Sequence, residues 1–159
     1  MRKYPSNQER TEEYLKLFNR EKTFKTIISD YDPIIFDVGA NNGRSLNEFK
    51  AWWPKSEVHC FEPQEECWEE LNNNASRHNQ TYINKSAISV NEGVINFYVH
   101  DISTGLAGSN KINIDSTDSI YLNQLKDQDD EVISAYTKTI NKPRGVPSLR
   151  IDSYMDKNS

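Results

Sequence analysis

The stretch that decides the fold is residues 34–43, which read IIFDVGANNG. Its first five residues form an almost continuous apolar run, as in strands that are buried on both faces of a parallel sheet. The turn from Gly39 to Gly43 follows, and residues 44–53 then place apolar side chains at helical spacing until Pro54. The stretch therefore predicts a strand, a glycine-containing turn and a helix.

The same alternation continues along the chain. Short apolar or amphipathic segments predict a second strand, a helix and a third strand at about residues 58–61, 65–77 and 82–88. Strands and helices that alternate with short loops are typical of a doubly wound α/β unit with a parallel sheet. Ahead of it, apolar residues at spacings of three, four and seven predict one amphipathic helix over about residues 7–29. We divide the chain into an N-terminal helix segment, 1–32, and an α/β domain, 33–159.

The pattern changes after the third predicted strand. Residues 91–93 form a predicted turn, and residues 94–99 are expected to pair with the preceding strand as an antiparallel hairpin. Residues 101–141 are mostly polar and indicate a loop with one or two short helices, whereas residues 149–151 predict a strand leading into a helix at Asp152.

The predicted sheet is incomplete for a doubly wound domain. The 59 residues from Asp101 onward are fewer than the roughly 80 that four more strands and their helices require. We therefore expect a truncated or split domain in which the strand at 34–38 is an apolar sheet edge. Such an edge is expected to pair with a complementary chain, to self-associate, or to be covered by residues 110–157.

Composition excludes several classes of partner. The chain has 24 acidic and 19 basic residues, a net charge of −5, and its basic residues are scattered, which argues against nucleic acid. No apolar run approaches a membrane span and no signal peptide begins the chain, so we expect no membrane partner and a cytoplasmic location. Cys60 and Cys67 are expected to be reduced thiols rather than parts of a metal site.

The candidate site lies where the first two predicted strands end. Ligands of open α/β sheets bind at the carboxyl ends of strands, where the turn from Gly39 to Gly43 lies. Glu62 follows Gly43 by 19 residues, and an acidic residue at the end of the second strand can accept hydrogen bonds from the ribose of an adenosine cofactor. A tight turn with an exposed glutamate is the purely structural alternative.

Asn41 bears on which cofactor is expected. A dinucleotide site carries glycine at the equivalent position so that a diphosphate can approach the backbone, and the Cβ of Asn41 disfavours that approach. S-adenosylmethionine has no phosphate and suits this turn better. A nicotinamide-dependent reductase is therefore the less favoured alternative.

Four motifs in this order resemble the FkbM-type S-adenosylmethionine-dependent methyltransferases: DVGANNG at 37–43, FEP at 61–63, NKSAI at 84–88 and PSLRIDSY at 147–154. The resemblance implies a Rossmann-like class I methyltransferase fold, here with three parallel strands and one antiparallel strand. It also implies methyl transfer to a hydroxyl of a sugar or small metabolite.

The resemblance assigns roles to particular residues. Those that would line the methionine end of the cofactor are Asp37, Gly39, Ala40, Asn41 and Gly43. Glu62 would hold the ribose, and Ser86 and Ala87 would border the adenine. His100 and Asp101 are the nearest candidates for a base, although we expect both to be surface residues, so no catalytic residue is assigned.

This sequence also departs from the family's pattern. Members continue into a further strand that reads like K-I-D-V-E-G, and no run in this chain resembles it. Whether the chain is an active enzyme is therefore left open. The alternative is a non-catalytic Rossmann-like partner or binding subunit.

Overall fold

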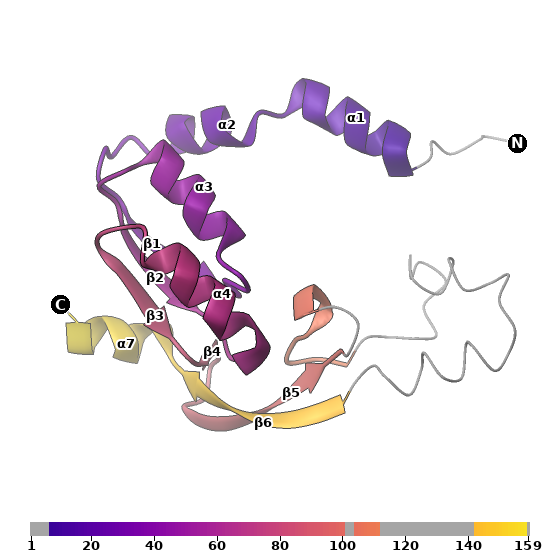
Figure 1. Cartoon of the computed structure of the whole chain (residues 1–159), viewed down its shortest axis with the longest axis vertical. Coiled ribbons are helices and arrows are strands. Elements are labelled where there is room, and N and C mark those ends of the chain that lie inside the picture. Colours follow the sequence, from indigo (N-terminus) through magenta and orange to yellow (C-terminus); the bar gives the residue numbers. More distant parts are fainter. Residues whose placement is uncertain (1–6, 101–103, 112–141, 159) are drawn as a thin grey trace, which may run out of the picture.

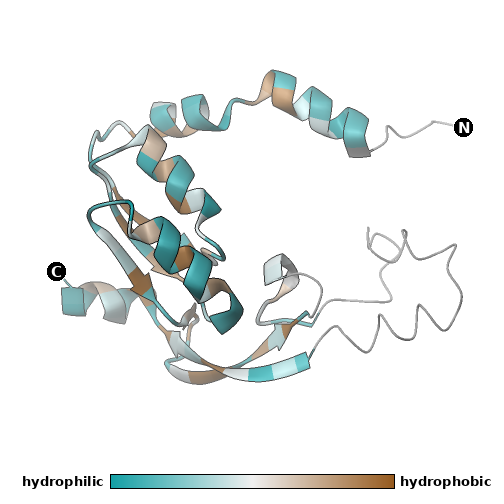
Figure 2. Ribbon diagram, viewed as in Figure 1, coloured by the Kyte–Doolittle hydropathy of each residue, from teal (hydrophilic) through white to brown (hydrophobic). Residues whose placement is uncertain are grey.

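The computed structural model describes residues 7–100, 104–111 and 142–158. Two three-stranded sheets and the helices around them make up this part of the chain (Figure 1). Figure 2 shows hydrophobic residues on strands of both sheets and mainly hydrophilic residues on helix α4 (Glu65–Ala75) and on the first half of the longest strand of the second sheet. The described residues form a mixed α/β fold, as expected for a Rossmann-like methyltransferase fold.

The first sheet is parallel and has the strand order β1-β2-β3, with β1 at Ile34–Val38, β2 at Glu57–Phe61 and β3 at Thr81–Asn84. Helices α3 (Arg44–Trp52) and α4 (Glu65–Ala75) connect these strands and cover one face of the sheet. The core between them consists of Ala40, Leu46, Val58, Cys60, Leu71 and Ala75. The three predicted parallel strands are confirmed, although the third ends at Asn84.

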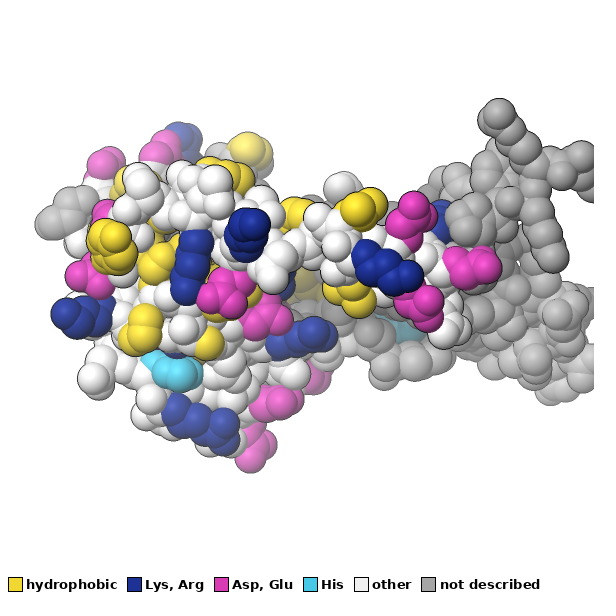
Figure 3. Space-filling model, turned by 90° about the horizontal axis from the view of Figure 1, so that it is seen from above, with side chains coloured by type: hydrophobic (Ala, Val, Ile, Leu, Met, Phe, Trp, Pro, Cys, Tyr) yellow, Lys and Arg dark blue, Asp and Glu magenta, His cyan; other side chains and the backbone are white. Residues whose placement is uncertain are grey.

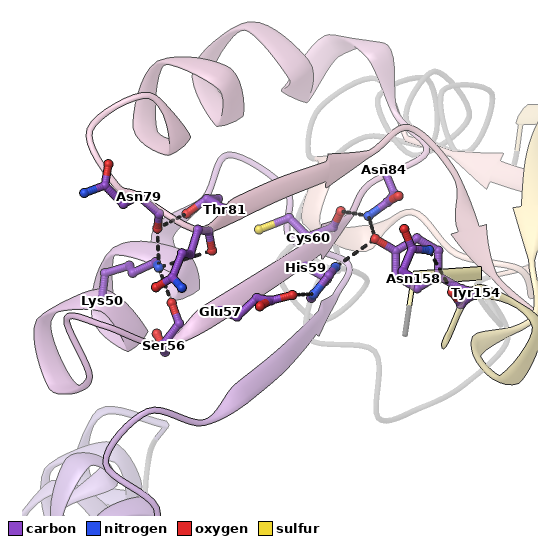
Figure 4. Close-up of polar contacts among 11 residues, drawn as sticks. Lys50, Ser56, Glu57, His59, Cys60, Asn79, Thr81, Asn84, Tyr154 and Asn158 are labelled. Atoms are coloured by element: carbon purple, nitrogen blue, oxygen red, sulfur yellow. Dashed lines mark hydrogen bonds and ion pairs between the residues drawn. The ribbon is translucent and has the colours of Figure 1, made fainter. Parts of the chain in front are cut away.

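A buried lysine fixes α3 to the loops before β2 and β3. Lys50 is 4% exposed, and its Nζ donates hydrogen bonds to the carbonyl oxygens of Ser56, Asn79 and Gln80 (Figure 4). Burial lowers the pKa of Lys50. Because charged hydrogen bonds satisfy these carbonyls, the lysine has a structural role at the end of the sheet opposite the candidate site.

Helix α7 (Ile151–Asn158) packs on part of the other face of the first sheet, where Tyr154 contacts Phe36, His59 and Phe61. Side chains alternate along a strand, so Val58 and Cys60 face the core while His59 and Phe61 face α7. The Tyr154 hydroxyl lies 2.7 Å from His59 Nδ1, and His59 Nε2 lies 2.8 Å from Glu57 Oε1 (Figure 4). An ionised carboxylate can only accept, so in the neutral imidazole Nε2 carries the proton and Nδ1 accepts that of the Tyr154 hydroxyl. The helix predicted at Asp152 is confirmed.

The second sheet has the order β4-β6-β5, with β4 at Ala87–Ile88, β5 at Gly93–Val99 and β6 at Lys142–Leu149. Our prediction of a hairpin between residues 94–99 and the preceding strand is wrong, because β6 lies between β4 and β5 and pairs with both. β5 is antiparallel, but to β6. Residues 142–148 were not predicted as strand, since Pro143 and Pro147 cannot donate to a ladder. Strand β4 pairs with β6 only at Ser148 and Leu149. On the β4 side of β6, neither proline is therefore required to donate a backbone N–H.

The N-terminal segment contains two helices rather than the single predicted one, α1 at Asn7–Leu17 and α2 at Arg20–Ile27. Asn19 separates them because its side chain accepts the backbone N–H of Lys22 at 2.8 Å and caps α2. Phe24 of α2 stacks on Trp52 of α3, and Arg20 pairs with Glu48. Only α2 is held against the α/β body by these contacts, whereas α1 extends away from it (Figure 1).

Strand β1 lies at the edge of its sheet and, within the described residues, pairs only with β2. Ile34 is 63% and Val38 57% exposed, so the expectation of a strand buried on both faces is wrong at its two ends. Residues 142–149 pair elsewhere, and residues 112–141 lie outside the described part. Pairing of this edge with another chain stays a prediction.

Two surface properties complete the description. None of the helices in the described ranges has the length and apolar character of a membrane span. On the face seen from above, acidic and basic side chains are interspersed and do not gather into a patch of one sign (Figure 3).

Candidate functional site

A sharp turn begins where β1 ends. The backbone N–H groups of Gly39 and Ala40 both donate to the carbonyl of Phe61, at 2.9 and 3.1 Å. Gly39 has φ +80° and Asn41 has φ +48°, a left-handed conformation that glycine and asparagine adopt most readily. The turn therefore ties the end of β1 to the end of β2, and we call residues 39–43 the elbow.

Glu62 follows β2 directly and lies beneath the elbow. Its side chain is 2% exposed, so an exposed glutamate, the structural alternative, is wrong. Its Oε2 accepts the backbone N–H of Asn41 and its Oε1 accepts that of Gln64, both at 2.8 Å. Backbone donors of this kind stabilise a buried carboxylate without a neighbouring cation. The structure thus brings the elbow and Glu62 together.

A cavity of about 290 Å³ opens over these groups, close to the lower end of the roughly 300–1,000 Å³ of small-molecule sites. Its polar residues gather around the elbow and β2 and include Asn41, Glu62 and Gln64. Its apolar walls come mainly from the second sheet and the residues after it. They include Ile88, Ile95, Phe97 and Ala107, while Val38, Phe61 and Pro63 line the cavity from the side of the first sheet.

Thr104 completes the polar end of the cavity. Its hydroxyl accepts Nδ2 of Asn41 at 2.9 Å, and its carbonyl accepts Nε2 of Gln64 at 3.0 Å. Neither Thr104 nor Gln64 was a predicted site residue. Thr104 lies 42 residues after Glu62 in a polar stretch with no recognisable motif, so no local pattern could have identified it. Gln64 could have been considered, since it lies two residues after the acidic residue.

The predicted site residues do not all face the cavity. Gly39, Asn41, Glu62 and Ala87 line it. Ala40 points into the core beside Leu46, and Gly43 is the N-cap residue of α3, where a Cβ would lie 3.1 Å from Leu71 Cδ1. Asp37 and Ser86 are not among the lining residues, but each has a buried side-chain oxygen, Oδ2 and Oγ respectively, for which the structure shows no hydrogen bond.

The titratable groups around the elbow are mainly affected by burial. Burial raises the pKa of Asp37, Arg20 opposes this shift, and the Glu62 carboxylate adds to it. Burial, together with the charge of Asp37, raises the pKa of Cys60 to about 12. Cys67 has a raised pKa for similar reasons, first burial and then Glu62. Both cysteines are free and buried, and at neutral pH they are thiols rather than nucleophilic thiolates.

His100, the base candidate that the structure describes, does not reach the cavity. His100 is 6% exposed, so its predicted surface position is wrong, and it is not among the cavity-lining residues. Burial follows from its place directly after β5, beside the buried Val99. Asp101 lies outside the described residues. Among the residues that are described, no cluster of three His, Cys, Asp or Glu side chains could hold a metal ion.

Sequence comparison identifies the class of protein that this fold and site belong to. The family model of the methyltransferase FkbM domain matches residues 37–159, which is most of the chain. The chain therefore belongs to the FkbM methyltransferase family, and the resemblance drawn from its motifs is confirmed. A curated relative is the 2-O-methyltransferase NoeI of Sinorhizobium fredii, which is 29% identical over 73 residues. The aligned region is 46% of this chain and 30% of that protein, so the chain spans less than a third of its relative.

Proposed function

We propose that this chain binds S-adenosylmethionine in the cavity above Glu62 and acts in methyl transfer to a hydroxyl group of a sugar or small metabolite. The observation that carries the proposal is the buried Glu62 carboxylate, held by the elbow at the polar end of a cavity with apolar walls. A nucleoside has the same division into a polar ribose and a flat, largely apolar base.

The side chains fit the adenosine part of the cofactor. Each Glu62 oxygen accepts one backbone N–H, whereas an ionised carboxylate has about four acceptor sites. Because Gln64 Nε2 also donates to Oε1, at 3.4 Å, the remaining acceptor capacity for a ribose hydroxyl lies mainly on Oε2. At the other end Ala87 lines the cavity next to Ser86, whose buried Oγ has no partner in the structure. In this proposal Ser86 and Ala87 border the adenine.

The charges around the elbow favour this cofactor over a dinucleotide. Asp37 and Glu62 place two carboxyl groups near the turn, and the Asn41 side chain occupies the position that a dinucleotide site keeps free. Carboxylates repel a diphosphate and attract the sulfonium and ammonium groups of S-adenosylmethionine. Asp37, Gly39, Ala40, Asn41 and Gly43 are proposed to surround its methionine end, some through backbone groups alone.

When bound, the cofactor supplies a methyl group on a positively charged sulfur. The residues described here would hold it in place, with Glu62 fixing the ribose and the walls of the cavity excluding water. Orientation of the acceptor oxygen toward the methyl carbon accounts for much of the acceleration in such a transfer. The oxygen acceptor is proposed from the family and from the relative's printed name, a 2-O-methyltransferase.

Titration calorimetry with S-adenosylhomocysteine, the demethylated product, tests the proposal, with NADH as the competing ligand. We expect the wild-type chain to bind S-adenosylhomocysteine and not NADH. Glu62→Ala should weaken binding by about 1.5–3 kcal/mol through the lost charged hydrogen bonds. Glu69→Gln, at an exposed position of α4, is the matched control. Binding of NADH alone, or of neither ligand by a folded chain, would contradict the proposal and favour a reductase or a non-catalytic binding subunit.

A further inference from the structure

Thr104 connects the two sides of the candidate cofactor site. Its hydroxyl bonds Asn41 of the elbow and its carbonyl bonds Gln64 of the loop after β2. These two residues are also the ones whose backbone N–H groups hold the two oxygens of Glu62. One residue therefore contacts both neighbours of the carboxylate.

The contact with Asn41 fixes the elbow. Asn41 is not glycine yet has φ +48°, and its Oδ1 accepts the backbone N–H of Asn42 at 2.9 Å. Because Oδ1 is engaged in this way, Nδ2 must point outward, where the Thr104 hydroxyl accepts it. The hydroxyl thus favours the side-chain orientation that leaves the Asn41 backbone N–H directed at Glu62.

The contact between the Thr104 carbonyl and Gln64 affects Oε1, the other carboxylate oxygen of Glu62. Gln64 is 4% exposed, and its Nε2 donates to the Thr104 carbonyl at 3.0 Å while lying 3.4 Å from Glu62 Oε1. Without the Thr104 carbonyl, this amide group would be free to turn fully onto Glu62 and to occupy acceptor capacity that a ribose hydroxyl needs.

Residues 104–109 are also anchored at their far end. Tyr98 of β5 and Gly108 exchange two backbone hydrogen bonds, at 2.8 and 3.1 Å. Between the Thr104 and Gly108 anchors, Gly105 and Ala107 form part of the cavity wall. The segment is a strap that crosses the cavity from the second sheet to the elbow.

We infer that Thr104 is a positioning residue for the cofactor, which holds Asn41 and Gln64 in the geometry that presents Glu62 to the ribose and keeps the strap closed over the bound ligand. This inference rests on the proposed function. It predicts that loss of the hydroxyl affects ligand dissociation more than association, because the Thr104–Asn41 bond must break before the strap opens.

The test compares Thr104→Val, which keeps the shape but removes the hydroxyl, with Thr104→Ser, which keeps the hydroxyl. Affinity for S-adenosylhomocysteine is measured by calorimetry, and its dissociation rate by stopped-flow tryptophan fluorescence. Trp68 is a suitable reporter because its indole N–H donates to the Glu62 carbonyl at 2.8 Å. Thr81→Val, at a partly buried position of β3, is the control for the same substitution away from the site.

We expect Thr104→Val to raise the dissociation constant by about 3- to 10-fold, mainly through faster dissociation, as the loss of one hydrogen bond predicts. Thr104→Ser should stay near the wild-type value. Wild-type affinity in both variants, or equal weakening in both, would overturn the inference while leaving the proposed function in place. Failure of the folded wild-type chain to bind S-adenosylhomocysteine would overturn the proposed function and this inference with it.

Discussion

The Glu62 carboxylate accepts the backbone N–H of Asn41 at 2.8 Å, across 21 positions of sequence. This bond joins the turn after β1 to the loop after β2, and it is possible because parallel register places Val38 beside Phe61. Glu62 therefore stabilises the fold as well as defining the candidate site.

Substitution of Glu62 by glutamine should reduce the stability of the ligand-free protein by about 1–3 kcal/mol. The amide has one accepting oxygen, so the N–H of either Asn41 or Gln64 would face an amide NH₂ group and lose its partner. Urea unfolding without ligand measures the change. Glu69→Gln, at an exposed position of α4, should unfold like the wild type, and an unchanged midpoint for Glu62→Gln would mean that these backbone bonds contribute little.

Gly43→Ala should destabilise the protein by about 1–3 kcal/mol, because a residue with a side chain pays roughly 1–2 kcal/mol for the left-handed conformation. Gly43 has φ +88°, and a Cβ there would also lie 3.1 Å from Leu71 Cδ1 and 3.2 Å from Asn74 Cβ. Thermal unfolding of Gly43→Ala and Gly108→Ala makes a matched comparison, since a Cβ on Gly108 would meet no atom within 4 Å. Gly108 has neither a left-handed φ nor a close neighbour, so equal unfolding temperatures for the two variants would refute both the conformational and the packing argument.

Asp37→Asn should stabilise the ligand-free protein near neutral pH. Burial raises the folded-state pKa of Asp37 above its ordinary value of 3.8. At a pH between 3.8 and the folded-state pKa, the folded state therefore binds more protons than the unfolded state. Stability then falls as pH rises through this window, and asparagine removes the effect. Denaturant unfolding from pH 4 upward should show the variant's advantage growing and then levelling off. If the difference in unfolding free energy between the variant and the wild type is constant with pH, Asp37 does not titrate differently in the folded and unfolded states.

Tyr154→Phe should destabilise the packing of α7 by about 1–2 kcal/mol, because Nδ1 of the buried His59 loses its donor. The ring itself would still pack against Phe36 and Phe61, so the change reports the hydroxyl. Tyr82→Phe is the control, since that ring stacks on His59 from an exposed position. Similar urea midpoints for Tyr154→Phe and the control would show that the polar contacts of the Tyr154 hydroxyl add nothing to the ring packing.

Local patterns predicted the first parallel sheet well. Residues 34–38 are strand as predicted, and the helices after β1 and β2 begin at the predicted residues, because Gly39, Gly43 and Pro63 set their boundaries locally. The break between α1 and α2 was missed. The capping side chain of Asn19 interrupts an apolar periodicity that continues on both sides of it.

Long-range pairing was the main source of error. The pattern of β5 gave no information on its partner, and β6 was hidden by Pro143 and Pro147, which argue against a strand when read locally. The two prolines are accommodated because β6 pairs with β4 only at its last two residues. Register between strands that lie far apart in sequence depends on this kind of tertiary context.

The amino-acid sequence alone determined the parallel sheet β1-β2-β3 and the position of Glu62 directly after its second strand. Both depend on apolar periodicity and on the residues of the turns. Tertiary structure decided which of the predicted site residues face the cavity. Packing turned Ala40 into the core, gave Gly43 a contact role against α4, and brought Thr104 onto Asn41 and Gln64. The physical reason is that spacing along a chain fixes the face of a strand or helix, but the neighbours of a loop residue depend on how the elements pack.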